Sequence, residues 1–324
     1  MYVTGLSAAA QRLALAALAA AALLGSGATT ASAAFPGRDG KLVYNWGSFS
    51  ESENPPYPSR TESALQTIPP GGRTPTTLRN CVKETGKPDV GDCSIAYGSP
   101  AVSPNGRQIA FDAGNRLALM RFDGSGLVLL PQHGADDGSP AFSPTGRRLA
   151  FVAGAIAVSG QPAPPSEIWT SDLAGANARR VTARGTAPAW STRNWIAFLR
   201  KDGVYRVRPD GRGLRRLVHR ARCSDVAWSP HGTQLAFACG TAHLGGRLYV
   251  ANGDGSHVRR VPIRYVSAQS VAWSPNGRRL AVISADGTLL IARLDGTQVP
   301  GGVGGGSGAT YTFGAGSVDW QRLP

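Results

Sequence analysis

The chain has 324 residues, of which 42% are hydrophobic, and it carries a formal net charge of +14 at pH 7. This apolar content can form a real core and excludes a globally disordered chain. No long helical periodicity follows the first 25 residues, which argues against a helical fold. The positive charge could attract anionic cell-surface polymers or head groups. Because the composition is rich in Arg, Ala and Gly, a GC-rich genome is the simpler explanation.

The N-terminus has the features of a targeting segment. Residues 13–24 form an unbroken apolar run of 12, whereas a membrane-spanning helix needs about 20. Small residues at 31–34 offer a cleavage site after Ala33. We therefore expect a signal peptide over 1–33 and a mature protein over 34–324 that is secreted or held in the cell envelope. Cleavage would remove one Arg and no acid and leave a charge of +13. An uncleaved anchor is the alternative.

The even number of cysteines predicts two disulfides in an exported protein. Proximity in the sequence favours Cys81 with Cys93 and Cys223 with Cys239. A hairpin around residues 230–232 that places Trp228 opposite Gln234 also places Cys223 opposite Cys239. A zinc site is the alternative, but the sequence has no Cys-x-x-Cys unit.

One pattern recurs along most of the chain. The stretch VAWSPNGRRLAV (271–282) has close relatives at 226–237, 140–151 and 100–111. Aligned repeats start, at intervals of 38–48 residues, at Pro100, Pro140, Pro188, Val226, Val271 and Val318. In each unit the pattern predicts a first strand, a Ser-Pro-x-Gly turn, and a second and a third strand. A Gly-containing turn then leads to a fourth strand, and four antiparallel strands form one propeller blade. The repeat at 187–198 lacks Pro-x-Gly, so its turn could differ.

A large side chain alternates with a small one in the first strand of each unit. The large residues are Val102, Phe142, Trp190, Trp228, Trp273 and Trp320, and the residue before each is Ala in five repeats and Asp319 in the last. Because neighbouring residues of a strand face opposite sides, we expect the large face of one blade to pack on the small face of the next. The tryptophans are then core residues.

The two ends of the chain are complementary. Residues 317–320 form a first strand with no second strand, and residues 40–44 form a second strand with no first. We therefore predict an all-β, six-bladed propeller that the C-terminal strand closes, which removes exposed sheet edges. Blade 1 comprises 40–80 and 317–321, and blades 2 to 6 begin near 99, 139, 187, 225 and 270.

The motif x-Ala-Trp-Ser-Pro-Asn/His-Gly-Arg-x-Leu-Ala-Phe, followed by Asp-Gly-x-x-x-Arg-x-Leu, resembles the TolB-type, WD-repeat-like propeller family over about residues 36–324. The resemblance implies the fold and says little about function. We expect the propeller alone, without the N-terminal α/β domain of TolB. The catalytic domain that dipeptidyl-peptidase-type hydrolases add to such a propeller is also expected to be absent.

Insertions in the predicted propeller all fall on one face, at 49–61, 80–98, 153–166, 240–246 and 299–316. Long loops on a rigid scaffold are typical binding elements. Candidate binding residues at this face and at the channel mouth are Asp136, Asp137, Arg222, Asp225 and Asp319. Asp136 and Asp137 could form a calcium-type oxygen cluster, although solvated acids are the simpler interpretation. The run 200–222 has a local charge of +7 and could bind an anionic partner or form a solvated outer edge.

The sequence offers little for catalysis. It has no Gly-x-Ser-x-Gly elbow and no His-Glu-x-x-His motif, so we predict no catalytic residue, no metal ligand and no cofactor. The expected function is an exported, monomeric, non-catalytic scaffold that recognises a protein or an anionic envelope component, with no nucleic acid and no transmembrane segment after cleavage. The alternatives are a channel-centred, metal-assisted hydrolase or lyase similar to lactonases, and a structural envelope protein.

Overall fold

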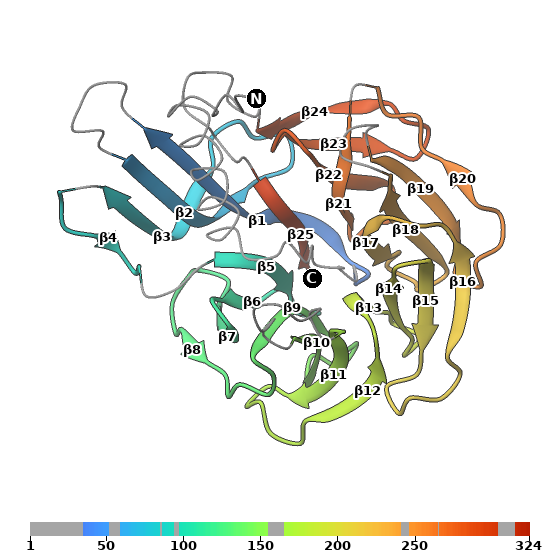
Figure 1. Ribbon diagram of the computed structural model, residues 1–324. Coiled ribbons are helices and arrows are strands. Elements are labelled where there is room, and N and C mark those ends of the chain that lie inside the picture. The colour runs from blue at the N-terminus through green and yellow to red at the C-terminus, as the bar shows by residue number, and fades with distance from the viewer. Residues whose placement is uncertain are drawn as a thin grey trace, which may run out of the picture.

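Six antiparallel sheets are arranged in a closed ring (Figure 1). The computed structural model describes residues 35–51, 59–84, 86–93, 97–154, 165–240, 246–264, 266–303 and 315–324. The predicted signal peptide therefore lies outside the described residues. Within these ranges all regular structure is β, and no helix is long and apolar enough to cross a bilayer. The predicted all-β, six-bladed fold is confirmed.

In blades 2 and 3 the strands lie in chain order from the inner strand outwards, whereas in blade 1 the C-terminal strand takes the inner position. Blade 1 contains β25 (Ala315–Leu323), β1 (Arg38–Glu51), β2 (Ser59–Ile68), β3 (Thr76–Glu84) and β4 (Val90–Gly91). Blade 2 contains β5 (Tyr97–Val102), β6 (Gln108–Ala113), β7 (Arg116–Arg121) and β8 (Val128–Leu129). Blade 3 contains β9 (Asp136–Phe142), β10 (Arg148–Gly154), β11 (Glu167–Asp172) and β12 (Arg179–Ala183).

The other three blades repeat the four-stranded plan. Blade 4 contains β13 (Thr186–Trp190), β14 (Ile196–Arg200), β15 (Gly203–Val207) and β16 (Arg215–His219). Blade 5 contains β17 (Cys223–Trp228), β18 (Gln234–Cys239), β19 (Arg247–Asn252) and β20 (Arg259–Arg260). Blade 6 contains β21 (Ala268–Trp273), β22 (Arg279–Ser284), β23 (Leu289–Arg293) and β24 (Gln298–Val303).

The Ser-Pro-x-Gly motif forms the turn between the inner two strands of a blade. In blade 2, Gly106 adopts a φ of +70° and donates its N–H to the carbonyl of Ser103 at 2.8 Å. The Ser103 hydroxyl accepts the N–H of Gln108 at 2.9 Å and so holds the far side of the turn. In blade 4, Asn194 takes the place of the glycine with a φ of +58°. Asparagine tolerates this left-handed conformation, so the degenerate repeat still closes its hairpin.

The C-terminal strand closes the ring as predicted. β25 pairs with β1 so that Trp320 lies opposite Leu42 and Asp319 lies opposite Val43. Trp320 is 2% exposed, and its indole N–H donates to the carbonyl of Gly40 at 3.0 Å. The ends of the described chain are therefore joined by a sheet that neither end could form alone.

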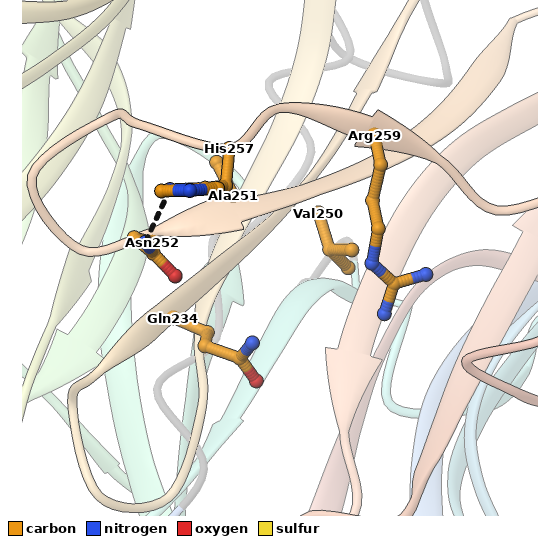
Figure 2. A pocket seen from close by; sticks show the side chains of 6 residues that line it. All are labelled: Gln234, Val250, Ala251, Asn252, His257 and Arg259. Carbon is orange, nitrogen blue, oxygen red and sulfur yellow. Dashed lines mark hydrogen bonds between the residues drawn. The ribbon is translucent and has the colours of Figure 1, made fainter.

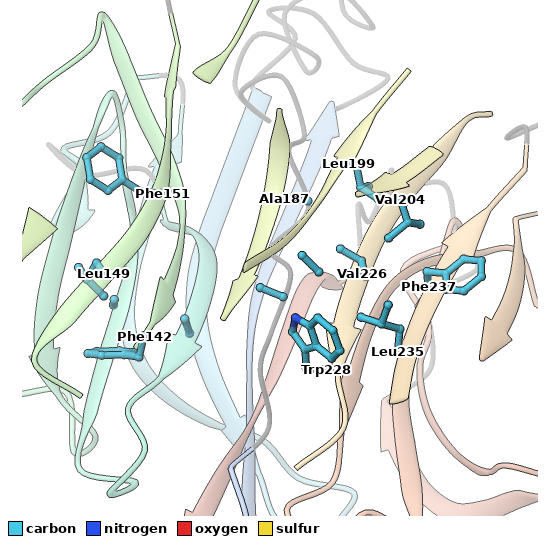
Figure 3. Packing of buried hydrophobic residues seen from close by; sticks show 14 of the residues in the cluster. Phe142, Leu149, Phe151, Ala187, Leu199, Val204, Val226, Trp228, Leu235 and Phe237 are labelled. Carbon is cyan, nitrogen blue, oxygen red and sulfur yellow. The ribbon is translucent and has the colours of Figure 1, made fainter. Parts of the chain in front are cut away.

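Neighbouring blades meet through the alternation of large and small side chains. Val271 and Trp273 of blade 6 share a buried cluster with Ala227 and Ala236 of blade 5. Figure 3 shows the same arrangement between blades 4 and 5, where Trp228 lies between the two sheets. The core role predicted for the tryptophans of the repeats is confirmed, because none is more than 2% exposed.

Phe35, the first described residue, also belongs to the core. It is 6% exposed and lies in the apolar cluster that contains inner-strand residues of blades 2 to 5. Close by in the chain, Gly37 donates its N–H to the carbonyl of Pro275, in the tight turn of blade 6, at 3.3 Å. The N-terminal end of β1 is thus fixed against the tight turns.

Both predicted disulfides form, Cys81 with Cys93 and Cys223 with Cys239, with Cα atoms 4.7 and 3.8 Å apart. The predicted hairpin register is wrong by one residue at Trp228, which lies opposite Leu235 and not opposite Gln234. The turn holds one residue more than expected. A register shift between Cys223 and Asp225 then brings the two cysteines opposite each other, as a β-bulge does.

A register shift of this kind interrupts the inner pair of strands in every blade. In blades 2 to 4 it coincides with a positive φ at Ser99, Ser139 and Ala187. A proline follows each of these three residues. Because the inner strand has a partner on one side only, a proline without an N–H can occupy its free edge.

Ring closure predicts a large energetic effect of Trp320. We expect Trp320→Ala to lower the free energy of unfolding by about 3–5 kcal/mol, because it leaves a cavity between blades 1 and 6. Trp320→Phe keeps most of the apolar volume and should cost clearly less. Equilibrium denaturation with urea measures both. A cost below about 1 kcal/mol for Trp320→Ala would contradict the closure mechanism.

Candidate functional site at the channel mouth

The long connections gather at one end of the ring. We call this end the long-connection face and the opposite end, with the Ser-Pro-x-Gly turns, the tight-turn face. Every inner strand starts at the long-connection face, because the connections between blades lead into it. The segments 52–58, 94–96, 155–164, 241–245 and 304–314, within the five predicted loops, lie outside the described residues. The strand ends that border them meet at this face.

Asp225 and Asp319 join neighbouring blades. Asp225 of β17 is fully buried and accepts the Val271 N–H at 2.8 Å and the Ser270 hydroxyl at 2.9 Å, both from β21. Asp319 of β25 accepts the Val102 N–H of β5 at 2.6 Å. Burial raises the pKa of Asp225 well above its usual range, and the charge of Asp319 adds to this. Both carboxylates act as acceptors for the backbone of the next blade.

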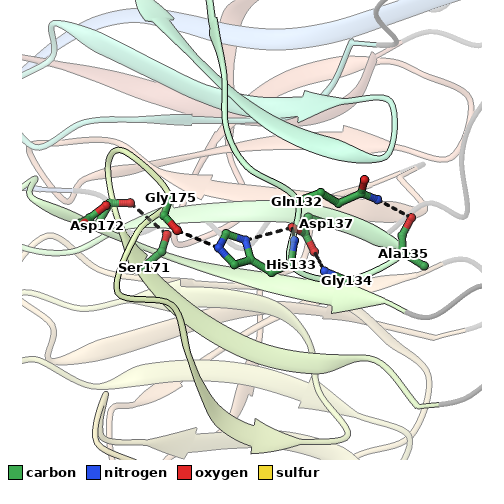
Figure 4. A network of polar contacts seen from close by, with 8 residues as sticks. All are labelled: Gln132, His133, Gly134, Ala135, Asp137, Ser171, Asp172 and Gly175. Atoms are coloured by element: carbon green, nitrogen blue, oxygen red, sulfur yellow. Dashed lines mark hydrogen bonds and ion pairs between the residues drawn. The ribbon is translucent and has the colours of Figure 1, made fainter.

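Asp137 holds the connection between blades 2 and 3. The side chain is fully buried and accepts the N–H groups of His133 at 2.6 Å and Gly134 at 2.7 Å. The imidazole of His133 lies between Asp137 and the carbonyl of Gly175, 2.7 Å from the latter (Figure 4). The preceding residue, Asp136, is exposed. Partial burial and the neighbouring charge of Asp137 raise the pKa of Asp136.

Asp112 of β6 is a half-buried acid that the sequence analysis missed. Its carboxylate accepts the Ser139 N–H of the next blade at 2.7 Å and bonds the hydroxyl of Ser99. Glycines flank it on both sides, and a Cβ on Gly98 or Gly138 would come within 3.2–3.3 Å of its side chain. Burial raises the pKa of Asp112 to about 7 against these hydrogen bonds. An acid within the apolar strand IAFDA was the available signal.

Arginine side chains around blades 4 and 5 rest on aromatic rings. The guanidinium carbons of Arg206 and Arg208 lie 4.3 and 3.7 Å from the ring centre of Trp195. That of Arg220 lies 4.1 Å from Tyr249. Arg222 is exposed beside the disulfide, and its carbonyl accepts the Gly240 N–H at 2.9 Å. The basic run 200–222 is therefore partly fixed in position, since stacking orients each guanidinium.

The five sequence-predicted residues thus fall into two groups. Asp137, Asp225 and Asp319 are buried and make hydrogen bonds within the ring, whereas Asp136 and Arg222 are exposed. Among the described residues, no three His, Cys, Asp or Glu side chains come close enough together to hold a metal ion. The channel mouth can present charge to a partner, and a binding role for all five residues stays a prediction.

A shallow pocket of about 350 Å³ lies on blade 5. Polar and apolar side chains line it, namely Gln234, Val250, Ala251, Asn252, His257 and Arg259 (Figure 2). His257 is bonded to Asn252 at 3.0 Å. No carboxylate, serine or cysteine lines this pocket, so it brings together no nucleophile with a base.

The repeat and the ring have known counterparts. Residues 265–291 match the family described as WD domain, G-beta repeat. TolB from Acinetobacter baumannii superposes with a TM-score of 0.59 and 17% identity, over 87% of this chain and 67% of that one. The chain shares the six-bladed β-propeller fold of TolB. The predicted resemblance is therefore confirmed at the level of the fold.

Other structures show how widely the propeller fold is shared. A chain of a nidogen/laminin complex matches with a TM-score of 0.58 and 11% identity, over 86% of this chain and 98% of that one. A puromycin hydrolase matches with a TM-score of 0.51 and 16% identity, over 82% of this chain and 45% of that one. In all, 1207 chains of solved structures are significantly similar. No curated protein matches in sequence. The fold alone therefore assigns no function.

The raised pKa of Asp112 predicts a pH-dependent stability. The folded state holds the proton up to about pH 7, whereas an unfolded aspartate loses it near pH 4. Stability from this group is therefore present at low pH and is lost as the pH rises towards 7. We expect Asp112→Asn, which mimics the neutral acid, to gain about a few degrees of Tm over the wild type between pH 5 and pH 8.

Thermal melting at intervals across this range measures the difference between the two proteins. Asp210→Asn is the control, because Asp210 is exposed in a turn of blade 4, and its profile should run parallel to the wild type. A profile of Asp112→Asn that also runs parallel would contradict the assignment of a raised pKa to this residue.

Proposed function

We propose that this TolB-like propeller is an exported, non-catalytic scaffold that recognises a protein or an anionic component of the cell envelope through its long-connection face. The observation that carries the proposal is the position of the two disulfides. Cys223 and Cys239 lie at the end of blade 5 where β18 leads into a long connection, and Cys93 lies in the connection from blade 1 to blade 2. Covalent links at the loop-bearing face support a pre-organised binding surface.

An extracytoplasmic location fits the same observation. Disulfides persist in oxidising compartments and are rare in the cytosol, and all four cysteines are paired. The apolar segment before Ala33 supplies the predicted export signal. A protein in that location meets envelope polymers and other exported proteins, whereas nucleic acid is not an expected partner. The proposed active form is a monomer.

Site-specific photo-crosslinking in the native envelope tests the proposed face. A photoreactive residue at position 222 samples the long-connection face, and one at position 147 samples the tight-turn face. Both positions are exposed arginines. We expect a discrete crosslinked species from position 222 and none from position 147, with mass spectrometry to identify the partner. Equal crosslinking from both positions, or crosslinking from position 147 alone, would contradict recognition through the long-connection face.

A melting experiment separates the scaffold from a channel-centred, metal-assisted hydrolase or lyase. A ligand that binds only the folded state raises Tm by mass action. For a scaffold without a metal site we expect millimolar calcium or manganese to leave Tm within about 1 °C of its value in chelator, whereas occupied metal sites shift it by several degrees. A rise of several degrees at low millimolar metal would favour the enzyme.

A further inference from the structure

An aromatic residue and an arginine face each other across the outer strands of three consecutive blades. In each case the aromatic residue is on the third strand and the arginine on the fourth. The pairs are Trp169 with Arg180 in blade 3, Tyr205 with Arg216 in blade 4, and Tyr249 with Arg260 in blade 5. A phenylalanine of the second strand lies opposite each aromatic residue. The same structural unit therefore occurs three times in succession.

In blades 3 and 4 a carboxylate of the same blade completes the unit. Glu167 accepts the indole N–H of Trp169 at 3.0 Å and pairs with the guanidinium of Arg180 at 2.9 Å. In blade 4, the Asp202 carboxylate accepts the Tyr205 hydroxyl and pairs with Arg216, both at 2.8 Å. In both blades one carboxylate thus bonds the polar atom of the ring and the arginine together.

Blade 5 has the ring and the arginine but no acid at the corresponding place in the unit. Arg247 stands two residues before Tyr249, at the position that corresponds to Glu167 in blade 3. Residues two apart in a strand share a face, so Arg247 lies on the Tyr249 side of the sheet. A third cation, Arg220, stacks on the ring and donates to the Tyr249 hydroxyl at 3.1 Å. None of the ion pairs between described residues includes Arg220, Arg247 or Arg260.

The surroundings of Tyr249 are rigid. Phe237 stacks on its ring with the centroids 5.6 Å apart. Cys239, which lies opposite Arg247, is tied to Cys223 of the inner strand. Tyr249 itself is only 8% exposed, whereas Arg247 and Arg260 are exposed. The cations therefore project from a fixed base and their positive charge is open to solvent.

We infer that the cluster of Arg220, Arg247, Tyr249 and Arg260 binds a carboxylate of an acidic polypeptide. The partner supplies the group that Glu167 and Asp202 supply within blades 3 and 4. The Tyr249 hydroxyl accepts from Arg220 and keeps its own proton to donate, and arginines bind carboxylates with strong, charge-assisted hydrogen bonds. A polypeptide is favoured because a side-chain carboxylate already fills this place twice in the same chain. The inference rests on the proposed scaffold function and names the partner's chemistry.

Binding of a hexaglutamate peptide to the purified mature protein tests the inference, with hexaglutamine and polyphosphate as comparison ligands. Arg247→Glu gives blade 5 an acid at the position that Glu167 has in blade 3, so the new carboxylate should occupy the site in place of the ligand. We expect about a tenfold or greater loss of hexaglutamate affinity, since hydrogen bonds between charged groups are among the strong ones. The control Arg147→Glu makes the same charge change at an exposed position of the tight-turn face and should lose less than about twofold, as a weak and screened surface charge does.

Further measurements distinguish binding at this cluster from a loss of stability and from general charge attraction. Arg247→Glu should melt within a few degrees of the wild type, and Arg260→Gln, which adds no charge, is a second variant expected to weaken hexaglutamate binding. Equal losses in Arg247→Glu and Arg147→Glu would show general charge attraction and overturn the inference. Tighter, Arg247-dependent binding of polyphosphate would overturn the choice of a polypeptide, and so would equal binding of hexaglutamine. If hexaglutamate fails while position 222 still crosslinks a partner, the inference falls and the proposed function stands.

Discussion

The inner strand of each blade has a partner on one side only, so the N–H groups on its free edge need another acceptor. An unpaired buried N–H costs free energy comparable to a lost hydrogen bond. Two solutions occur around the ring. Prolines at the aligned position of blades 2 to 4 remove an N–H donor. At blades 2, 3 and 6, an aspartate of the preceding blade accepts an N–H of the inner strand, and these aspartates are Asp319, Asp112 and Asp225. The ring is therefore held together by polar contacts between blades as well as by its apolar seams.

The same requirement explains which features the sequence could predict. Turn residues and the alternation of large and small side chains are local signals, and they predicted the blades and the closure by Trp320. The even number of cysteines and their proximity in the sequence predicted both disulfides. The bulge near Ser224 is one inserted residue without a sequence signature, so the register of Trp228 was wrong by one. Asp112 joins strands 27 residues apart, and a contact of that kind is invisible in a single sequence. Asp225 and Asp319 were found as acids, but their acceptor role depends on donors of the neighbouring blade.

Acidic residues are few, and most described ones have internal partners. Those in the turns between third and fourth strands accept N–H groups of their own turn, as Asp123 does from Ser125 at 2.9 Å and Asp295 from Thr297 at 2.8 Å. Hydrogen bonds from these turns lower the pKa of both groups. Others hold inner strands or connections. At blade 5, none of the described ion pairs includes Arg220, Arg247 or Arg260, so part of the excess positive charge gathers there.

The buried position of Phe35 fixes the first described residues to the centre of the ring. Phe35 lies in the central cluster and Gly37 is bonded to a turn of the tight-turn face, so the first described residues connect that face with the core of the ring. A variant shortened from the N-terminus past Phe35 would therefore lose a core side chain and not only the segment before it.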